Sequence, residues 1–343
     1  MRPPRITGMD LVIATVLPFV IYYGNFLDLG QNRDVFPRQQ FHLIFDGTIG
    51  AFLFSNAVST GMAISKGSGL KPLQVYLAKR GLFFILIGLA LSLIWPSNLF
   101  MLLGGCAILS ALVIPLNSNF LFFLGAIVSF GAISLSHFGD LLIHLSPWNG
   151  QFPMSLVNHF LKNGHYALLP WFLFWIVGVI YSRGDFFTKR GKDLRSFMGI
   201  ILLIIGGLIE FFFEHILSGG TSASNHPFNR SSILDLHLPS FLIAASGLII
   251  IVFNLVMKLN EKIESGILIT ALRFFGKMKY SVLLAQAIIG GIISFRLTGL
   301  ETYGCASIIG MTVIGTLLSI IVSYFWTKRF GLGPVEKVLK MFT

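Results

Sequence analysis

Residues 76–95 read YLAKRGLFFILIGLALSLIW, and this stretch decides the fold class. The basic pair Lys79–Arg80 is followed directly by an apolar run over residues 81–95 that contains no charged side chain. Such a run is typical of a helix that crosses the hydrocarbon core of a bilayer. A basic pair at its start indicates the cytoplasmic end of that helix.

Apolar stretches of similar length recur along the chain and predict ten membrane-spanning helices. With both termini in the cytoplasm, their alternation leaves all but five of the 25 Lys and Arg residues on the cytoplasmic side. The sequence therefore predicts an all-α, polytopic integral membrane helix bundle. We place its spans at residues 9–27, 43–65, 81–95, 98–116, 119–137, 165–183, 196–218, 237–257, 278–295 and 302–326.

The composition agrees with this class, with 55% hydrophobic and 11% charged residues and a mean hydropathy of +0.81. These values exclude a soluble domain. A net charge of +11 would favour a nucleic-acid partner in a soluble protein, but here the cytoplasmic cations account for it. We expect no nucleic acid, a lipid bilayer with anionic headgroups as partner, and one transmembrane domain over residues 1–343 that can form a homo-oligomer. A bacterial cytoplasmic (inner) membrane is the simplest location for such a multi-pass chain.

Two cytoplasmic connections are predicted to carry short helices of their own. Residues 66–80 read as a Gly/Lys turn and a basic interfacial helix that ends at Lys79–Arg80. Residues 258–277 read as a second interfacial helix with mixed charge. Paired glycines inside the spans, such as Gly104–Gly105 and Gly206–Gly207, predict close contacts between helices.

The candidate catalytic residues lie on the side of the membrane opposite to the cytoplasm in this predicted topology. All eight His residues fall in outer connections or at outer helix ends, and the sharpest pair is His42 and Asp46. Because they are four residues apart on a helix, the carboxylate can orient the imidazole as a general base. A helix cap made by the same pair is the plainer alternative. Glu210, about two turns inside the membrane, is a further candidate because a charged acid in lipid is costly.

Eight His residues could bind a zinc ion instead of acting as acids or bases, but the sequence does not predict a metal site. The chain has no HExxH motif and no two His residues four apart, and its two Cys lie far from the His residues on the map. The glycine-rich phosphate loops and the serine nucleophile elbow are missing as well. We therefore expect no permanently bound cofactor.

Six stretches share features with one known family. Two of them, YLAKRGLFFILIGLALSLIW (residues 76–95) and LFMLLGGCAILSAL (residues 99–112), are similar to its third and fourth helices, and four others lie elsewhere in the chain. They are GMDLVIATVLPFVIYYGN (residues 8–25, from Asp10 to Asn25), FDGTIGAFLFSNAVSTGMAIS (residues 45–65, with Asp46 before a Phe-rich run), HYALLPWFLFWIVGVIYSRG (residues 165–184, with Leu-Pro-Trp) and FFGKMKYSVLLAQ (residues 274–286). In these stretches the chain resembles the heparan-α-glucosaminide N-acetyltransferase family and its bacterial relatives, part of the wider group of transmembrane acyltransferases.

The chain also departs from that family. Val12-Ile13-Ala14 stands where the family usually carries Arg-Gly, and Met101-Leu102 stands in place of a Gln-Arg pair. The family's catalytic His precedes the Asp at a position near Phe36 here, and the nearest His is His42. Either His42 takes the role from a shifted position, or this member has lost or changed the chemistry.

The resemblance implies an acyltransferase, with acetyl-CoA or another acyl-CoA as the cytoplasmic co-substrate and a glycan or related small molecule as the outer acceptor. His42 and Asp46 would then be the catalytic residues. Inner Lys71, Lys79 and Arg80 would attract the phosphates of the donor, because cations of this kind bind phosphate oxygens.

Three further residues complete the candidate set for donor or substrate binding: Asn25, Trp171 and Glu210.

An alternative from a different class is a proton- or ion-coupled transporter or flippase of a small or lipid-linked substrate. It would use Glu210 and Asp46 as membrane-embedded proton or cation sites.

Overall fold

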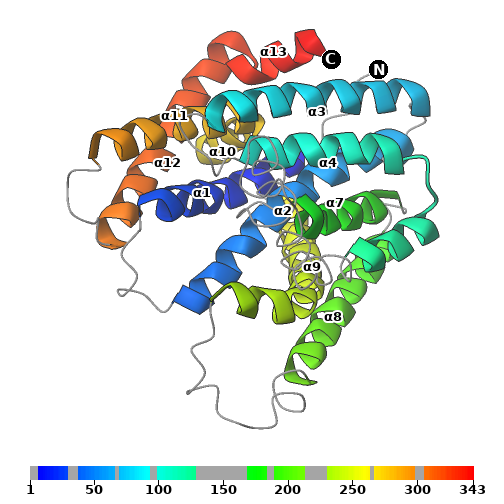
Figure 1. Cartoon of the computed structure of the whole chain (residues 1–343). Helices are drawn as coiled ribbons and strands as arrows, with labels where there is room; N and C mark the ends of the chain where they lie inside the picture. Colours follow the sequence, from blue (N-terminus) through cyan, green and yellow to red (C-terminus); the bar gives the residue numbers. More distant parts are fainter. Residues whose placement is uncertain are drawn as a thin grey trace, which may run out of the picture.

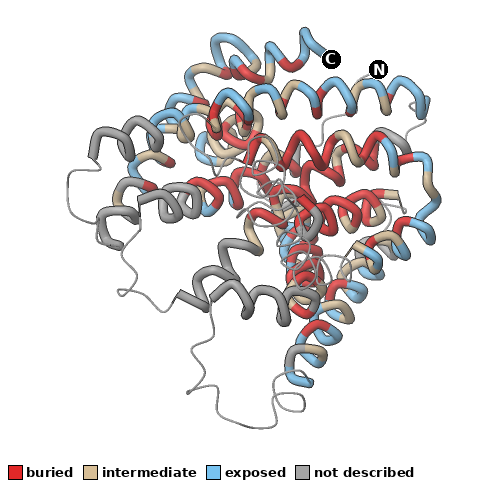
Figure 2. Tube along the Cα trace, viewed as in Figure 1, coloured by how far each residue is buried: buried red, intermediate tan, exposed pale blue. Residues whose placement is uncertain are grey.

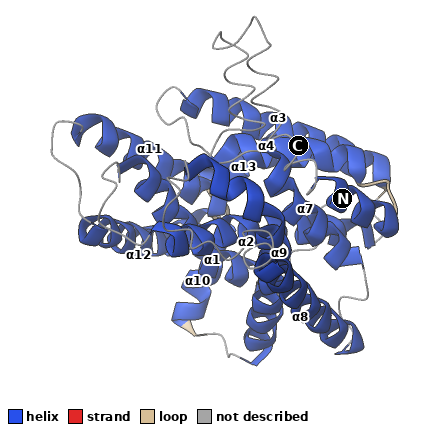
Figure 3. Cartoon of the chain, turned by 60° about the horizontal axis from the view of Figure 1, so that its bottom comes forward, coloured by secondary structure: helices blue, strands red, loops and turns tan. Residues whose placement is uncertain are grey.

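The computed structural model describes residues 7–29, 38–65, 69–92, 99–128, 168–183, 189–212, 230–262, 266–297 and 305–343. These residues form helices and the short turns between them, and they contain no strand (Figure 3). The all-α prediction is therefore confirmed for the part of the chain that the structure describes.

The labelled helices follow the chain in the order shown in Figure 1. They are α1 (Thr7–Leu29), α2 (Arg38–Ser65), α3 (Leu70–Ser92), α4 (Leu99–Val113), α7 (Leu168–Arg183), α8 (Lys189–Phe212), α9 (Arg230–Lys262), α10 (Ile267–Lys277), α11 (Lys279–Leu297), α12 (Cys305–Phe330) and α13 (Pro334–Phe342). A further helical stretch covers residues 118–128.

The prediction of a separate interfacial helix within residues 66–80 is wrong, because α3 runs without a break from Leu70 to Ser92. Leu73, Leu77, Arg80 and Phe84 are all buried on it. Their spacing of three and four residues makes one continuous stripe, so the basic segment and the apolar run share one helix face. Arg80 therefore lies inside the helix rather than at its end.

Other helices extend past the predicted spans. The second interfacial helix exists as α10, but α9 continues to Lys262 before it. α8 begins at Lys189, and α9 begins at Arg230 inside an expected outer connection. The short helix α13, with Pro334 in its first turn and Val335 and Leu339 buried, was not predicted from the sequence. Hydropathy windows locate apolar stretches, whereas helices continue through polar residues that favour helical backbone.

Three helix pairs make the most extensive contacts: α8 with α9, α2 with α7, and α3 with α4. α1 lies among them and packs against α2, α9, α10, α11 and α12. The crossing of α3 and α4 depends on Gly81 and Gly104, because a Cβ on Gly81 would lie 2.8 Å from the carbonyl oxygen of Gly104. Gly206 similarly faces α9, whereas a Cβ on Gly207 would meet nothing within 4 Å. The predicted role of Gly104 and Gly206 in close packing is confirmed, and that of Gly207 is wrong.

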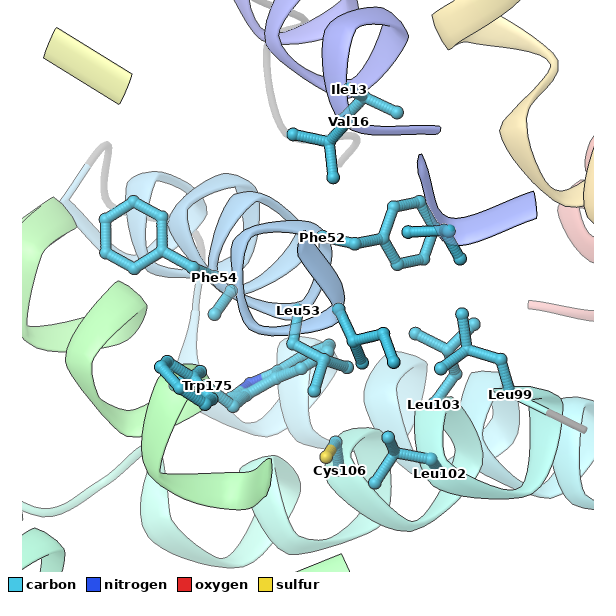
Figure 4. Close-up of a cluster of buried hydrophobic side chains, with 14 of the residues drawn as sticks. Ile13, Val16, Phe52, Leu53, Phe54, Leu99, Leu102, Leu103, Cys106 and Trp175 are labelled. Carbon is cyan, nitrogen blue, oxygen red and sulfur yellow. The ribbon is translucent and has the colours of Figure 1, made fainter. Parts of the chain in front are cut away.

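The centre of the described part is apolar. Figure 4 shows side chains of α2, among them Phe52 and Leu53, beside those of α1, α4 and α7. Phe52 and Phe54 are completely buried, and Trp175 is nearly so. The buried residues lie toward the middle of the assembly in Figure 2, with exposed positions on the outer helices. In a bundle of membrane helices, close van der Waals packing of such rings holds the helices together.

The outer helices expose apolar rather than polar surface. On α12 the exposed large hydrophobic side chains are Val313, Ile314, Leu317, Leu318, Ile321, Val322, Phe325 and Phe330. Contiguous exposed apolar surface of this kind is uncommon on soluble monomers and typical of helices that face lipid. Two described helices, Leu70–Ser92 and Ser240–Asn260, are long and apolar enough to cross a membrane. The structure thus agrees with a membrane protein in its helix content, lengths and surface.

Candidate functional site: a buried cationic cluster

The site is built around Asn56, an amide side chain in the middle of the apolar helix α2. Asn56 is completely buried, and its Nδ2 donates to the carbonyl oxygen of Phe52 at 2.8 Å. That bond fixes the orientation of the amide, so Oδ1 is the atom left to accept hydrogen bonds from other helices.

Three donors from two other helices converge on this one oxygen. Lys279 Nζ donates to Asn56 Oδ1 at 2.6 Å, and the Tyr280 hydroxyl donates to it at 2.6 Å. Arg80 Nη2 lies 3.3 Å from the same atom and also donates to the hydroxyl oxygen of Tyr280. An amide oxygen has two lone pairs, so three donors exceed what Asn56 can accept at full strength.

Arg80 is held mainly by aromatic rings. Its side chain is 6% exposed, and its guanidinium carbon lies 5.5 Å from the ring centre of Phe84 and 5.4 Å from that of Tyr280. Lys279 lies over the same Tyr280 ring at 5.0 Å. Among the described residues, Arg80 has no carboxylate partner, and its Nε has no hydrogen-bond partner. Cation–π contacts compensate in part for the water that this guanidinium has lost.

The two cations are close enough to repel each other. Because Arg80 Nη2 and Lys279 Nζ both contact Asn56 Oδ1, they are separated by no more than the sum of those two contact distances. Two unit charges ~6 Å apart repel by roughly 3 kcal/mol at an effective dielectric constant of about 20. A buried site that brings cations together in this way favours the binding of an anion.

Glu336 of α13 holds the helix that carries Lys279 and Tyr280. Its Oε1 accepts the backbone N–H of Tyr280 at 2.8 Å and that of Ser281 at 3.2 Å, and its Oε2 accepts the Ser281 hydroxyl. Ser281 Oγ in turn accepts the backbone N–H of Val335 at 3.0 Å. These amides lie in the first turn of α11, where backbone N–H groups lack partners within the helix. Glu336 therefore caps α11 from a distant part of the chain.

A second polar group joins α7, α8 and α9. The Tyr181 hydroxyl donates to Asn254 Oδ1, and Asn254 Nδ2 donates to the Ser196 hydroxyl at 3.1 Å. The guanidinium carbon of Arg195 lies 4.9 Å from the ring centre of Tyr181. Cations thus recur beside aromatic rings at this end of the helices.

Arg183, the last residue of α7, binds the turn that directly follows α4. Its Nη2 donates to the carbonyl oxygen of Ile114 at 2.6 Å, and its Nη1 donates to that of Leu116. Carbonyl groups at a helix C-terminus lack partners within the helix and carry partial negative charge, so a guanidinium is a suitable partner.

The predicted donor-binding residues separate into two kinds. Arg80 belongs to the cluster, whereas Lys71 and Lys79 are exposed on α3. Trp171 is 7% exposed and packs with its ring centre 5.8 Å from that of Phe174, so it belongs to the core.

The predicted acid–base residues lie at positions where the structure describes the helical backbone but not the side chains. His42 and Asp46 lie on α2, Asn25 lies on α1, and Glu210 lies on α8. The helical backbone keeps His42 and Asp46 four residues apart on one helix, and their mutual geometry stays a prediction. None of the eight His side chains is among those described, so the zinc alternative also lies outside them.

Sequence reasoning missed Asn56, Tyr280 and Glu336. One signal was available, since Asn56 is the only amide or charged side chain in the stretch FLFSNAVST of residues 52–60, whose other members are apolar or carry a hydroxyl group. A buried polar side chain needs partners, but the sequence does not say which helix supplies them.

The described residues thus form an all-helical protein with apolar outer surfaces and a cationic polar cluster inside, and two of its helices are long and apolar enough to cross a membrane. Residues 167–343 match the family described as protein of unknown function (DUF418). The match covers more than half of the chain, and the chain belongs to this family. It includes Lys279, Tyr280 and Glu336, whereas Asn56 and Arg80 come before it. No curated protein matches the chain.

Proposed function

We propose that this protein is a membrane-embedded acyltransferase with about ten transmembrane helices and both termini in the cytoplasm. It moves an acetyl or short acyl group from cytoplasmic acyl-CoA to a glycan or related small-molecule acceptor on the outer side of a bacterial inner membrane. In the transfer, the thioester C–S bond breaks and a C–O or C–N bond forms on the acceptor. The proton of the acceptor leaves through His42, and CoA departs as the thiol.

The observation that carries this proposal is the grouping of cations around one set of helix ends. Lys258 pairs with Asp193 at 3.6 Å, and Arg273 donates to Asn260 Oδ1 at 2.9 Å. Each contact joins two segments that the sequence assigns to the cytoplasmic side, as does the contact of Arg183 with Leu116. A donor that carries several phosphates suits such a surface, since Lys and Arg attract phosphate groups over long range.

The remaining residues then take distinct roles. Exposed Lys71 and Lys79 on α3 attract the donor, and buried Arg80 binds it once it has entered. Asn25 lines the passage toward the outer side, and Trp171 supports that passage from within the apolar core. There His42, oriented by Asp46, removes the proton of the acceptor or carries the acyl group in transit.

The test uses purified protein in liposomes with acetyl-CoA labelled in the acetyl group. We expect release of free CoA thiol and label on the protein or on added amino sugars. His42→Ala should abolish both signals, while His226→Ala, a change in an outer connection without an assigned role, should leave them intact. Size-exclusion profiles check that both variants fold. Unchanged turnover in His42→Ala would remove the proposed base.

The same preparation distinguishes the transporter alternative. Buried charged residues inside apolar helices also occur along transport paths, and Arg80 is such a residue. Uptake of a solute that depends on a proton gradient, without loss of the thioester, would replace acyl transfer with transport.

A further inference from the structure

The cluster around Asn56 contains more hydrogen-bond donors than acceptors. Arg80, Lys279 and Tyr280 all direct a donor at the same oxygen, and Arg80 Nε is buried without a partner among the described residues. Buried donors without acceptors are costly, and the cost rises when the donors are charged. A fold that brings such groups together on three helices gains from a ligand that supplies oxygen atoms.

The charge of the cluster around Asn56 also favours a ligand that supplies negatively charged oxygen atoms. Arg80 brings a buried positive charge that no described carboxylate contacts, and Glu336 accepts hydrogen bonds at the start of the helix that carries Lys279. Glu336, however, directs its oxygens at the backbone amides and hydroxyl of α11. The positive charge of Arg80 therefore stays without a described carboxylate on the side of the cluster that faces Asn56.

We infer that Arg80, Lys279, Tyr280 and Asn56 form a binding site for a phosphate group. A guanidinium presents two parallel N–H groups to phosphate oxygens, and an ammonium adds a point charge beside it. The phosphate takes the donors of Lys279 and Arg80 from Asn56 Oδ1, and the Tyr280 hydroxyl keeps its bond to that oxygen. The partial exposure of Lys279 leaves an approach from the surface.

This inference extends the proposed function by naming the cluster as a site for one phosphate of the donor. It does not depend on catalysis, because binding is measured without turnover. A phosphate can come from soluble coenzyme A or from the headgroup of an anionic lipid, and both present the same oxygens to the cluster.

The decisive variant is Asn56→Asp, which places a carboxylate of the same size where the three donors meet. The new carboxylate neutralises the cations and competes with a phosphate for their N–H groups. We expect the affinity for coenzyme A to fall by about tenfold or more. Tyr280→Phe keeps the ring that supports Arg80 and Lys279 but removes the hydroxyl that accepts from Arg80 and donates to Asn56 Oδ1. Arg80 is then held less firmly toward the phosphate, so the affinity should fall severalfold. Arg80→Lys keeps the charge but loses the paired N–H groups and should also bind more weakly.

The matched control is Arg329→Gln. Arg329 is an exposed arginine on α12 whose guanidinium carbon lies 5.4 Å from the ring centre of Phe330, so the same charge is removed from an aromatic contact outside the cluster. Its affinity for coenzyme A should equal that of the unaltered protein. Size-exclusion chromatography and circular dichroism identify variants that do not fold, and the remaining folded variants decide the question.

Binding is measured by calorimetry with coenzyme A on protein in nanodiscs of phosphatidylcholine or phosphatidylglycerol. Binding that is weakened in the cluster variants and kept in Arg329→Gln supports the site with a soluble phosphate as its ligand. Thermal stabilisation by phosphatidylglycerol that disappears in Asn56→Asp, without binding of coenzyme A, supports the site with a lipid phosphate and counts against the proposed donor. Equal behaviour of all folded cluster variants and the control in both tests would overturn the inference.

Discussion

The strongest structural prediction concerns Glu336, the carboxylate that links α13 to the first turn of α11. In Glu336→Ala the backbone N–H groups of Tyr280 and Ser281 lose their acceptor, and the Ser281 hydroxyl loses its partner as well. Hydrogen bonds to charged groups contribute about 1.5–3 kcal/mol each when buried. Glu336 is partly exposed, so water replaces some of these contacts and about 1 kcal/mol per bond is the better value.

Three such bonds predict a loss of about 3 kcal/mol in the local stability of the start of α11. Glu336→Gln should lose only about 1 kcal/mol, because the amide oxygen still accepts both backbone N–H groups and only the charge at the helix N-terminus is removed. Lys337→Ala is the matched control, since Lys337 is exposed on the same helix.

Hydrogen–deuterium exchange of the peptide that covers residues 278–284 reports this stability directly. A loss of about 3 kcal/mol raises the exchange rate of the freed amides by roughly a hundredfold when exchange follows local opening. We expect amide exchange to be fastest in Glu336→Ala, slower in Glu336→Gln and slowest in Lys337→Ala. If Glu336→Ala exchanges at the rate of Lys337→Ala, the carboxylate does not hold α11 and the role given to α13 is refuted.

Two further perturbations test the packing of the helices. Gly206→Ala should destabilise the protein by about 1–3 kcal/mol, because the new Cβ would lie 2.5 Å from the backbone nitrogen of Ala244; the neighbouring Gly207→Ala meets open space and should stabilise it by about 0.5–1 kcal/mol. Thermal unfolding in detergent measures both, and equal shifts would show that α8 does not approach α9 through Gly206. Arg183→Gln should cost about 1–3 kcal/mol through the carbonyl groups left in the turn that directly follows α4, and an unchanged unfolding temperature would contradict that contact.

The sequence predicted the fold class well and the ends of the helices less well. Apolar runs without charges identified most of the described helices, because their side chains must face lipid or one another. The error at residues 66–80 arose because Lys79–Arg80 was taken as the end of an interfacial helix, with the span beginning only at residue 81. Leu73 and Leu77 continue the buried stripe of α3, and Arg80 is buried on it as well. Whether a basic residue ends a helix or enters the core depends on what lies opposite, and in this case Asn56 and Tyr280 lie there.

The sequence by itself determined the helical class, the apolar character of the spans and the uneven distribution of cations, because these follow from the side chains of neighbouring residues along the chain. Only the tertiary structure decided that Asn56, Arg80 and Tyr280 meet, because the hydrogen bonds join residues 24 and 224 positions apart. Hydropathy and periodicity depend on local spacing and carry no information about which helix faces which. The partners of a buried amide are selected by packing, through positions such as Gly81 and Gly104 where helices approach closely.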